Sequence, residues 1–321
     1  MKALTQSLVL LCAALAQPAW AQNYPSKTIQ LVVTAGPGSS ADITARIVGE
    51  ELGKLLGQPV VIDNRAGAGG NIAAEYVAKA PADGHTLLMA TGSTHGINPS
   101  LYGKLRFDPI ADFAPIGLIT TSPNVLVVSN KLGLRSVQDI VAAARKGANE
   151  LSYSSGGSGT SQNLAGEVFA TAMGVKLLHV PYKAAPQAMT AVISGEVSMS
   201  FVSAPVALAQ SKSNAIVPIG VTSLQPLAMW PELPTIASLG LAGFDVSAWF
   251  GLAAPAGTPA PVVDKLHDSL RKVLEMSTVR ARLHQQGMEV ARSSPTHFAG
   301  FIKSEIERWT QVVRASGARV D

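Results

Sequence analysis

Short apolar segments alternate with amphipathic helical segments along most of this chain, and that alternation restricts the fold more than any other feature. Residues 29–33 form an almost uninterrupted apolar run, which is typical of a buried β-strand. Residues 42–56 then carry apolar side chains at helical spacing, with charged side chains on the opposite side. Repeated strand–helix–strand units predict parallel strands joined by right-handed crossovers.

The same alternation continues to residue 221 and then gives way to helices. We expect helices to begin after Gly70, at a capping box formed by Ser136 and Asp139, and at Pro186, and we expect Gly57 to end the helix at 42–56. Further strands are expected at 60–62, 86–90, 125–128, 151–154, 178–180, 198–202 and 216–221, and further helices at 162–173, at 260–276 and from 294.

A chain of 321 residues is long enough for two domains. We predict an α/β protein with two lobes. Lobe 1 comprises residues 22–124 and 226–321, and lobe 2 comprises residues 125–225. The C-terminal helices are expected to pack back on lobe 1.

The first 21 residues predict a secretory signal peptide. Lys2 provides a positive start, residues 8–16 form a short apolar run, and residues 19–21 (AWA) have the small residues that signal peptidase requires. We therefore predict cleavage before Gln22 and export to the periplasm. The single cysteine, Cys12, lies inside this segment, so the mature chain has no disulfide and no thiol chemistry.

Several classes of function are disfavoured by what the sequence lacks. The formal net charge is +4 with scattered basic residues, which argues against a nucleic-acid-binding patch. The segment at 67–72 has isoleucine where a dinucleotide fingerprint needs its third glycine, and the segment at 156–161 lacks the lysine of a phosphate loop. Thr94 occupies the serine position of a nucleophile elbow, and the histidines show no metal-ligand spacing. We expect no cofactor, no metal and no enzymatic activity.

Four loops of small polar residues lead from an expected strand directly into a helix. They lie at 35–40, 91–95, 154–161 and 181–185. Such loops present backbone N–H groups at a helix N-terminus, where the helix dipole favours an anion. In open α/β sheets, ligands bind at the carboxyl ends of the strands. Each loop alone can be only a helix cap, but four of one type in two lobes indicate a ligand cleft between the lobes.

Longer segments resemble the Bug family of extracytoplasmic receptors, which is related to tripartite tricarboxylate transporters. The resemblance covers nearly the whole mature chain. It implies a type II periplasmic-binding-protein fold, a small carboxylate ligand and membrane transporter subunits as partners. The chain departs from the family pattern at Thr34, Ala35, Ser39 and residues 184–185, so the identity of the ligand stays open. The most specific segments are 64–72 (NRAGAGGNI), 83–88 (DGHTLL), 97–102 (INPSLY), 179–183 (HVPYK) and 249–259 (WFGLAAPAGTP).

Transferred residue by residue, the resemblance places the ligand pocket at the loops described above. The candidate ligand-binding residues are Gly36, Pro37, Gly38, Ser39, Ser40, Ser93, Thr94, His95, Ser155, Gly156, Gly159, Thr160, Ser161, Tyr182 and Ser203. No arginine lies in these loops, and Lys183 is their one obvious fixed cation. We therefore hypothesise that backbone N–H groups at 36–40 and 155–161 hold the carboxylate, aided by ordered waters.

Two other functions are compatible with the sequence. The protein could present its ligand to a sensor without transporting it, or, with little support, it could be a secreted hydrolase. In each case we expect a monomer.

Overall fold

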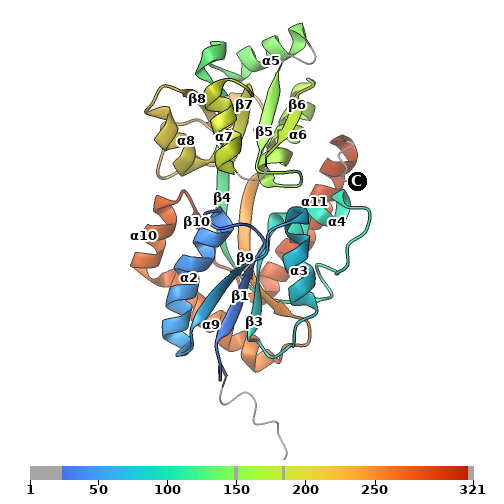
Figure 1. Ribbon diagram of the computed structural model, residues 1–321, viewed down its shortest axis with the longest axis vertical. Helices are drawn as coiled ribbons and strands as arrows, with labels where there is room; N and C mark the ends of the chain where they lie inside the picture. Colours follow the sequence, from blue (N-terminus) through green and yellow to red (C-terminus); the bar gives the residue numbers. More distant parts are fainter. Residues whose placement is uncertain (1–23, 148–150, 183–184, 317–321) are drawn as a thin grey trace, which may run out of the picture.

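The computed structural model describes residues 24–147, 151–182 and 185–316, which form two lobes stacked along the long axis of the molecule (Figure 1). Each lobe is a β-sheet with helices on both faces. The two-lobed α/β fold expected from the sequence is confirmed. The expected signal peptide at 1–21 and Lys183 lie outside the described residues.

Lobe 1 contains strands in the order β2-β1-β3-β9-β4, with β10 also paired to β4. Strand β1 is parallel to β2 and β3, whereas β9 runs antiparallel to β3 and β4. The elements of this lobe are β1 (Ile29–Val33), α2 (Ser40–Leu56), β2 (Val60–Asn64), η2 (Ala68–Gly70), α3 (Asn71–Ala78), β3 (Thr86–Thr91), η3 (Ser93–Ile97), α4 (Asn98–Leu101), β9 (Ser247–Pro255), α9 (Ala260–Glu275), α10 (Ser277–Gln285), β10 (Glu289–Val290) and α11 (Pro295–Ser316).

Lobe 2 contains strands in the order β4-β7-β5-β6, with β8 on the other side of β4. Strand β5 is parallel to β6 and β7, whereas β4 runs antiparallel to β7 and β8. The elements of this lobe are η4 (Asn130–Leu132), α5 (Val137–Lys146), β5 (Ser152–Ser155), α6 (Ser161–Met173), β6 (Leu178–Pro181), α7 (Ala185–Ser194), β7 (Met199–Ser203), α8 (Ala204–Ser211), β8 (Ile216–Val221) and η5 (Ala237–Leu239).

The long strand β4 (Phe113–Ser129) belongs to both sheets. Its residues 113–123 pair with β9, and its residues 124–129 pair with β7 and β8. The chain returns at residue 247, which pairs with Pro123 at the start of β9. Residues 227–246 pack into the apolar clusters of lobe 2 before that return. We therefore propose that the lobes meet at Asn124 and at Val246, the second boundary lying later than the expected 225/226.

Most helices and strands appear where the sequence pattern predicts them. The αL residue Gly57 ends α2, and the Ser136 hydroxyl caps α5 by accepting the N–H of Asp139. The expectation of parallel pairing is confirmed for β1 with β2 and β3 and for β5 with β6 and β7, but it is wrong for β4 and β8, which pair antiparallel. Strands β9 and β10, which the sequence analysis did not expect, also pair antiparallel. Strand β4 carries the chain from lobe 1 into lobe 2, and β9 carries it back. The two strands therefore run in opposite directions where they pair.

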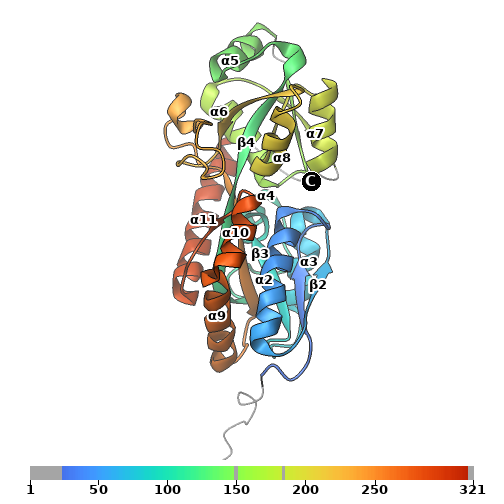
Figure 2. The ribbon, with the colours of Figure 1, turned by 90° about the vertical axis from the view of Figure 1, so that its left-hand side faces the viewer.

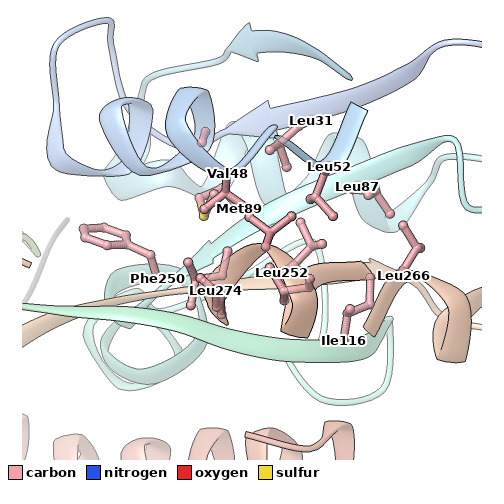
Figure 3. Close-up of a cluster of buried hydrophobic side chains, with 14 of the residues drawn as sticks. Leu31, Val48, Leu52, Leu87, Met89, Ile116, Phe250, Leu252, Leu266 and Leu274 are labelled. Atoms are coloured by element: carbon pink, nitrogen blue, oxygen red, sulfur yellow. The ribbon is translucent and has the colours of Figure 1, made fainter. Parts of the chain in front are cut away.

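The lobe 1 core lies between its sheet and the helices α2 and α9 (Figure 3). Inward-facing residues of neighbouring strands meet the apolar side of each helix, which is why both helices carry apolar residues at helical spacing. The expectation that C-terminal helices pack on lobe 1 is confirmed by this contact. The labelled side chains are Leu31, Val48, Leu52, Leu87, Met89, Ile116, Phe250, Leu252, Leu266 and Leu274.

Helix α11 packs on both lobes. Its first half packs on lobe 1 through Phe298, and its second half joins the lobe 2 core through Trp309. Figure 2 shows α11 running lengthwise past the junction of the lobes. The buried Glu305 carboxylate accepts the indole N–H groups of Trp249 and Trp309 at 2.8 and 3.0 Å. The helix therefore ties β9 of lobe 1 to the side of lobe 2.

Candidate ligand-binding site

The candidate loops lie along two facing sheet edges. Because β1 and β3 are parallel, the loops that follow them share one edge of lobe 1. Because β5 is parallel to β6 and β7, Ser155, Tyr182 and Ser203 share one edge of lobe 2. The two edges touch, since the Ser93 hydroxyl donates a 3.0 Å hydrogen bond to the Gly159 carbonyl. The structure thus gathers loops from distant parts of the sequence at the lobe junction.

The loop before α2 is a turn that hydrogen bonds hold in place. Gly38 has a φ of +80°, a conformation that favours glycine. The Ser39 hydroxyl caps the helix by accepting the N–H of Asp42 at 3.2 Å. The Asp42 carboxylate in return accepts the Gly38 N–H at 2.9 Å, together with hydrogen bonds from Arg46 and Asn64.

Asp42 is ionised although it is only 2% exposed. Burial on its own would raise the pKa of this carboxyl. The hydrogen bonds that it accepts, led by those from Arg46 and Gly38, outweigh burial and hold the pKa below its ordinary value of 3.8. The ionised carboxylate accepts the hydrogen bonds that fix the turn, and an ion pair with Arg46 neutralises its charge.

The turn before α6 repeats the same construction in lobe 2. Gly159 has a φ of +77°, and the Thr160 hydroxyl accepts the N–H of Asn163 at 3.3 Å. The Asn163 side-chain oxygen accepts the Gly159 N–H at 3.0 Å. Residues 38–42 and 159–163 therefore share the pattern glycine, hydroxyl cap, two residues, then an aspartate or asparagine acceptor. Each lobe presents one helix N-terminus built in this way.

The first-turn amides of both helices are donors without a partner in the described structure. Within the described ranges, the structure gives no hydrogen-bond partner to the N–H groups of Ser40 and Ala41 in α2, or of Ser161 and Gln162 in α6. These are the orphan donors expected at a helix start. Combined with the helix dipole they favour an anion, and α2 and α6 are 17 and 13 residues long.

Four other amides of the loops already have partners, so the two loops do not offer N–H groups to a ligand along their whole length, contrary to the hypothesis drawn from the sequence. The Gly156 N–H donates to the Gln162 side chain at 2.8 Å, and the Gly157 N–H donates to the Ser155 hydroxyl at 3.2 Å. The amides of Gly38 and Gly159 are used in the two turns. These four groups shape the loops rather than face a ligand.

The lobes make close contacts on two sides of this region. A Cβ on Gly159 would lie 3.0 Å from the Leu101 side chain of lobe 1. On another side, a Cβ on Gly287 of lobe 1 would lie 2.9 Å from Pro205 of lobe 2. At the crossing strand, the Asn124 side chain donates to the Ser161 hydroxyl at 3.2 Å. The lobes are therefore in direct contact on two sides of the candidate site.

Thr94 and His95 lie in the interior of lobe 1. Both are fully buried, and the His95 ring packs edge-on against Phe113 with centroids 4.7 Å apart. His95 Nδ1 lies 2.8 Å from the Thr94 hydroxyl, whereas Nε2 has no partner among the described residues. Burial lowers the pKa of His95 to about 3, so the ring is neutral at neutral pH. These two candidates support the loop and do not present side chains at the lobe junction.

Ser155 and His179 form a hydrogen-bonded pair, with 2.7 Å between Oγ and Nε2. Such a pair is the core of a nucleophile and base. Here, however, Ser155 is fully buried, and its hydroxyl also bonds the backbone N–H and carbonyl of Gly157. An enclosed hydroxyl with three partners holds a loop and is poorly placed to attack a substrate.

The last two candidates lie on the lobe 2 edge with different environments. Tyr182 is half-buried, and its hydroxyl is 3.4 Å from Glu196. Burial and the nearby Glu196 raise the pKa of Tyr182. Ser203 ends β7, pairs with Asn124 in register and precedes α8.

In lobe 1, Pro37 is exposed and Gly36 has open space around it, so a ligand can approach this side of the loop before α2.

Functional residues that the sequence analysis missed are the polar side chains that shape the turns. Asn64, Asn163, Gln162 and Asn124 bond the loops or their caps. A signal for Asn163 was present, because it stands four residues after a loop glycine, as Asp42 does. No local pattern marks Asn64 or Asn124, since the chain brings them in from other strands.

The described part of the chain has no group of three histidine, aspartate or glutamate side chains placed to hold a metal. None of its helices is long and apolar enough to cross a bilayer. Two surface hollows, of about 460 and 270 Å³, lie beside α3 and between α9 and the start of α11, and neither is lined by a candidate residue.

Comparison with known proteins gives one consistent result. Residues 44–318 match the tripartite tricarboxylate transporter family receptor. Among solved structures, Rpa4515 of R. palustris with adipate is 34% identical with a TM-score of 0.87, covering 92% of this chain and 100% of that one. Periplasmic binding protein BugD is 31% identical with a TM-score of 0.84, covering 92% and 99%. MatC of Rhodopseudomonas palustris with bound malate is 32% identical with a TM-score of 0.83, covering 90% and 100%.

Proposed function

This chain belongs to the tripartite tricarboxylate transporter receptor family, and on that premise we propose that it binds a small dicarboxylate between its lobes and delivers it unchanged to a membrane transporter. The family is one of binding receptors, and the relatives of known structure hold adipate and malate. Both molecules are dicarboxylates. Support for the same class of ligand here comes from the donors at the lobe junction.

The observation that carries this proposal is the matched pair of turns at α2 and α6. Each lobe contributes a helix N-terminus whose first two N–H groups have no partner in the described structure. A hydrogen bond to a charged group contributes roughly 1.5–3 kcal/mol. Four such bonds contribute about 6–12 kcal/mol before losses, and micromolar binding needs about 8 kcal/mol. Carboxylate capture by backbone amides therefore suffices without an arginine.

The proposed contacts are the first-turn amides of Ser40, Ala41, Ser161 and Gln162, of which Ser40 and Ser161 are among the candidate residues. Gly36 to Ser40 and Ser155 to Ser161 supply the two turns, with Ser93 and Ser203 beside them. Tyr182 would approach the ligand only after leaving Glu196. Thr94 and His95 are buried in lobe 1 and support the Ser93 loop by packing, without contacting the ligand.

The proposed location is the periplasm, with cleavage before Gln22 and a monomeric mature protein. The relative BugD is periplasmic. Tyr24, two residues after the proposed N-terminus, is buried with its hydroxyl bonded to the Gly84 carbonyl at 2.7 Å. A buried residue thus lies within two positions of the proposed mature N-terminus. N-terminal sequencing of the exported protein should give Gln22, and a chain starting at Met1 would refute export with cleavage.

The binding test compares adipate and malate with adipamide, in which each carboxylate is replaced by a neutral amide. We expect calorimetry to detect at least one dicarboxylate and no adipamide. Ligand should also reduce the radius of gyration in X-ray scattering, because hinge bending closes the lobes on it. The same data should give the mass of a monomer. Equal binding of adipamide, or no binding of any C4–C6 dicarboxylate, would reject the proposal.

A proline at the first helical position removes one of the proposed donors without disturbing the helix. Position N1 tolerates proline, and the preceding cap Ser39 has the extended conformation (ψ 159°) that a following proline requires. Ser40→Pro should weaken dicarboxylate binding roughly 10- to 150-fold, the value of one charge-assisted hydrogen bond. Ser40→Ala keeps the N–H and is the matched control. Equal affinities of the two variants would show that this amide does not hold the ligand.

A further inference from the structure

Side chains behind the lobe 2 turn form a connected set whose arrangement has no counterpart in the lobe 1 turn. Tyr153 and His179 are paired residues on β5 and β6, and their rings stack with centroids 4.8 Å apart and an interplanar angle of 23°. Tyr153 is fully buried against α6, where a Cβ on Gly166 would collide with its ring. The Tyr153–His179 pair is therefore fixed to the sheet and to the helix together.

The histidine side of the pair holds the start of the turn. His179 Nε2 bonds the Ser155 hydroxyl, which accepts the N–H of Gly157. The Gly157 carbonyl then accepts the Thr160 hydroxyl at 2.8 Å. Thr160 is the N-cap of α6. A continuous path of hydrogen bonds thus runs from His179 to the residue that orients the first-turn amides.

The tyrosine side of the pair holds the end of the turn. The Tyr153 hydroxyl donates to Glu167 at 2.5 Å and accepts the Asn163 side-chain amide at 2.8 Å. Asn163 in turn accepts the Gly159 N–H. Both ends of the turn are therefore held from one stacked pair. Burial also keeps the histidine neutral, since it lowers the pKa of His179 to about 4.

We propose that His179 is a positioning residue of the ligand site, which acts through Ser155 and Gly157 to hold the α6 turn in its binding conformation. This inference rests on the proposed function, because it assigns the α6 turn to the ligand. A neutral imidazole suits the task, since it bonds the hydroxyl without the cost of burying a charge. The lobe 1 turn is held instead by the ion pair of Asp42 and Arg46.

Two substitutions separate the hydrogen bond of His179 from its packing. His179→Phe keeps a ring stacked on Tyr153 and cannot bond Ser155, whereas His179→Gln keeps a nitrogen close to the position of Nε2. We expect His179→Phe to weaken adipate or malate binding roughly three- to tenfold, the value of one neutral hydrogen bond. We expect His179→Gln to stay within about twofold of the unmodified protein. The reverse order would overturn the proposal.

A double-mutant cycle tests whether His179 acts through Ser155. Ser155→Ala should weaken binding by about the same factor as His179→Phe, and the double variant should be no weaker than either single one. If the fold-changes of the two single substitutions multiply in the double variant, His179 contributes only general packing. That result would overturn the proposal.

Amide hydrogen exchange gives a readout that needs no ligand. His179→Phe should speed exchange at Gly157 and its neighbours while the middle of α6 stays protected. Unchanged exchange at Gly157 would overturn the proposal even if the unmodified protein bound none of the dicarboxylates. In that case the proposed function would fail separately, through the calorimetry of the unmodified protein.

Discussion

Replacing the buried His95 should make the protein less sensitive to acid. His95→Phe keeps an aromatic ring against Phe113 and removes the only titratable group at this position. The Thr94 hydroxyl keeps hydrogen bonds to the backbone of Thr91 after the change. The variant also removes the Nε2 atom that is buried without a partner in the described structure.

The size of the effect follows from the pKa of His95. Its ordinary value is 6.5, and burial lowers it to about 3 in the folded protein. Between these values the unfolded chain binds a proton at this ring and the folded protein does not, so folding stability falls as pH falls. This contribution is fully present above pH 6.5 and declines toward pH 3. At pH 5 the loss is about 1.5 units times 1.4, or about 2 kcal/mol.

The assay is urea unfolding at pH 7 and at pH 5, followed by far-ultraviolet circular dichroism. The unmodified protein should lose about 2 kcal/mol more stability between these pH values than His95→Phe does. His179 also has a lowered pKa, but it is present in both proteins and cancels in the comparison. His297→Gln, which removes an exposed histidine, is the matched control for the loss of a histidine.

The reasoning is refuted if His95→Phe and the unmodified protein lose the same stability between pH 7 and pH 5. That result would mean that the His95 ring titrates normally in the folded protein and therefore reaches water. A variant that is folded at pH 7 but responds more strongly to acid would refute it as well.

Five further substitutions test the turns and the core. Gly159→Ala and Gly174→Ala should each cost about 1–2 kcal/mol because both have positive φ, but only Gly159→Ala should weaken adipate or malate binding in calorimetry, since its Cβ meets lobe 1. Equal affinities would contradict the closed contact. Gly251→Ala should destabilise the protein by about 1–3 kcal/mol in urea unfolding because its Cβ collides with an α11 ring, whereas Gly300→Ala, in open space on α11, should stabilise it by about 0.5–1 kcal/mol. Asp42→Asn should lower stability at pH 7 by about 2–3 kcal/mol. Because the folded pKa of this carboxyl is lowered, that difference should shrink as pH falls below 3.8, and a difference independent of pH would argue against an ionised Asp42.

The helices and parallel strands could be predicted because their signals are local. Cap residues such as Ser136 and Gly57 mark helix ends, and apolar spacing marks the buried sides. The first half of β4 and all of β9 were missed. Both contain proline and glycine, which ordinarily interrupt strands, at Pro115, Gly117 and Gly251. Their stability comes from pairing with each other across a long separation in sequence, which no local pattern reports.

The sequence predicts a site at the level of loops and not of individual groups. Strand ends followed by small residues identify the candidate segments, and the sheet topology brings the segments of each lobe to one edge. Which amides stay unpaired depends on acceptors such as Asn163 and Gln162, whose side chains fold back over the turn. The same limit applies to His95, because a loop histidine in the sequence carries no sign of whether its ring faces water or the interior.

The shared carboxylate at the junction of β9 and α11 gives the molecule an internal optical probe. Trp20 lies in the predicted signal peptide, so the mature chain has Trp230, Trp249 and Trp309, all buried. Two of these indoles bond one oxygen of Glu305, at the place where α11 leaves lobe 1 for lobe 2. Indole emission responds to a nearby negative charge, so a shift of α11 against β9 would change the colour and intensity of the fluorescence without any label. A lobe movement that bends β4 and leaves this carboxylate in place would not change the fluorescence of the two indoles.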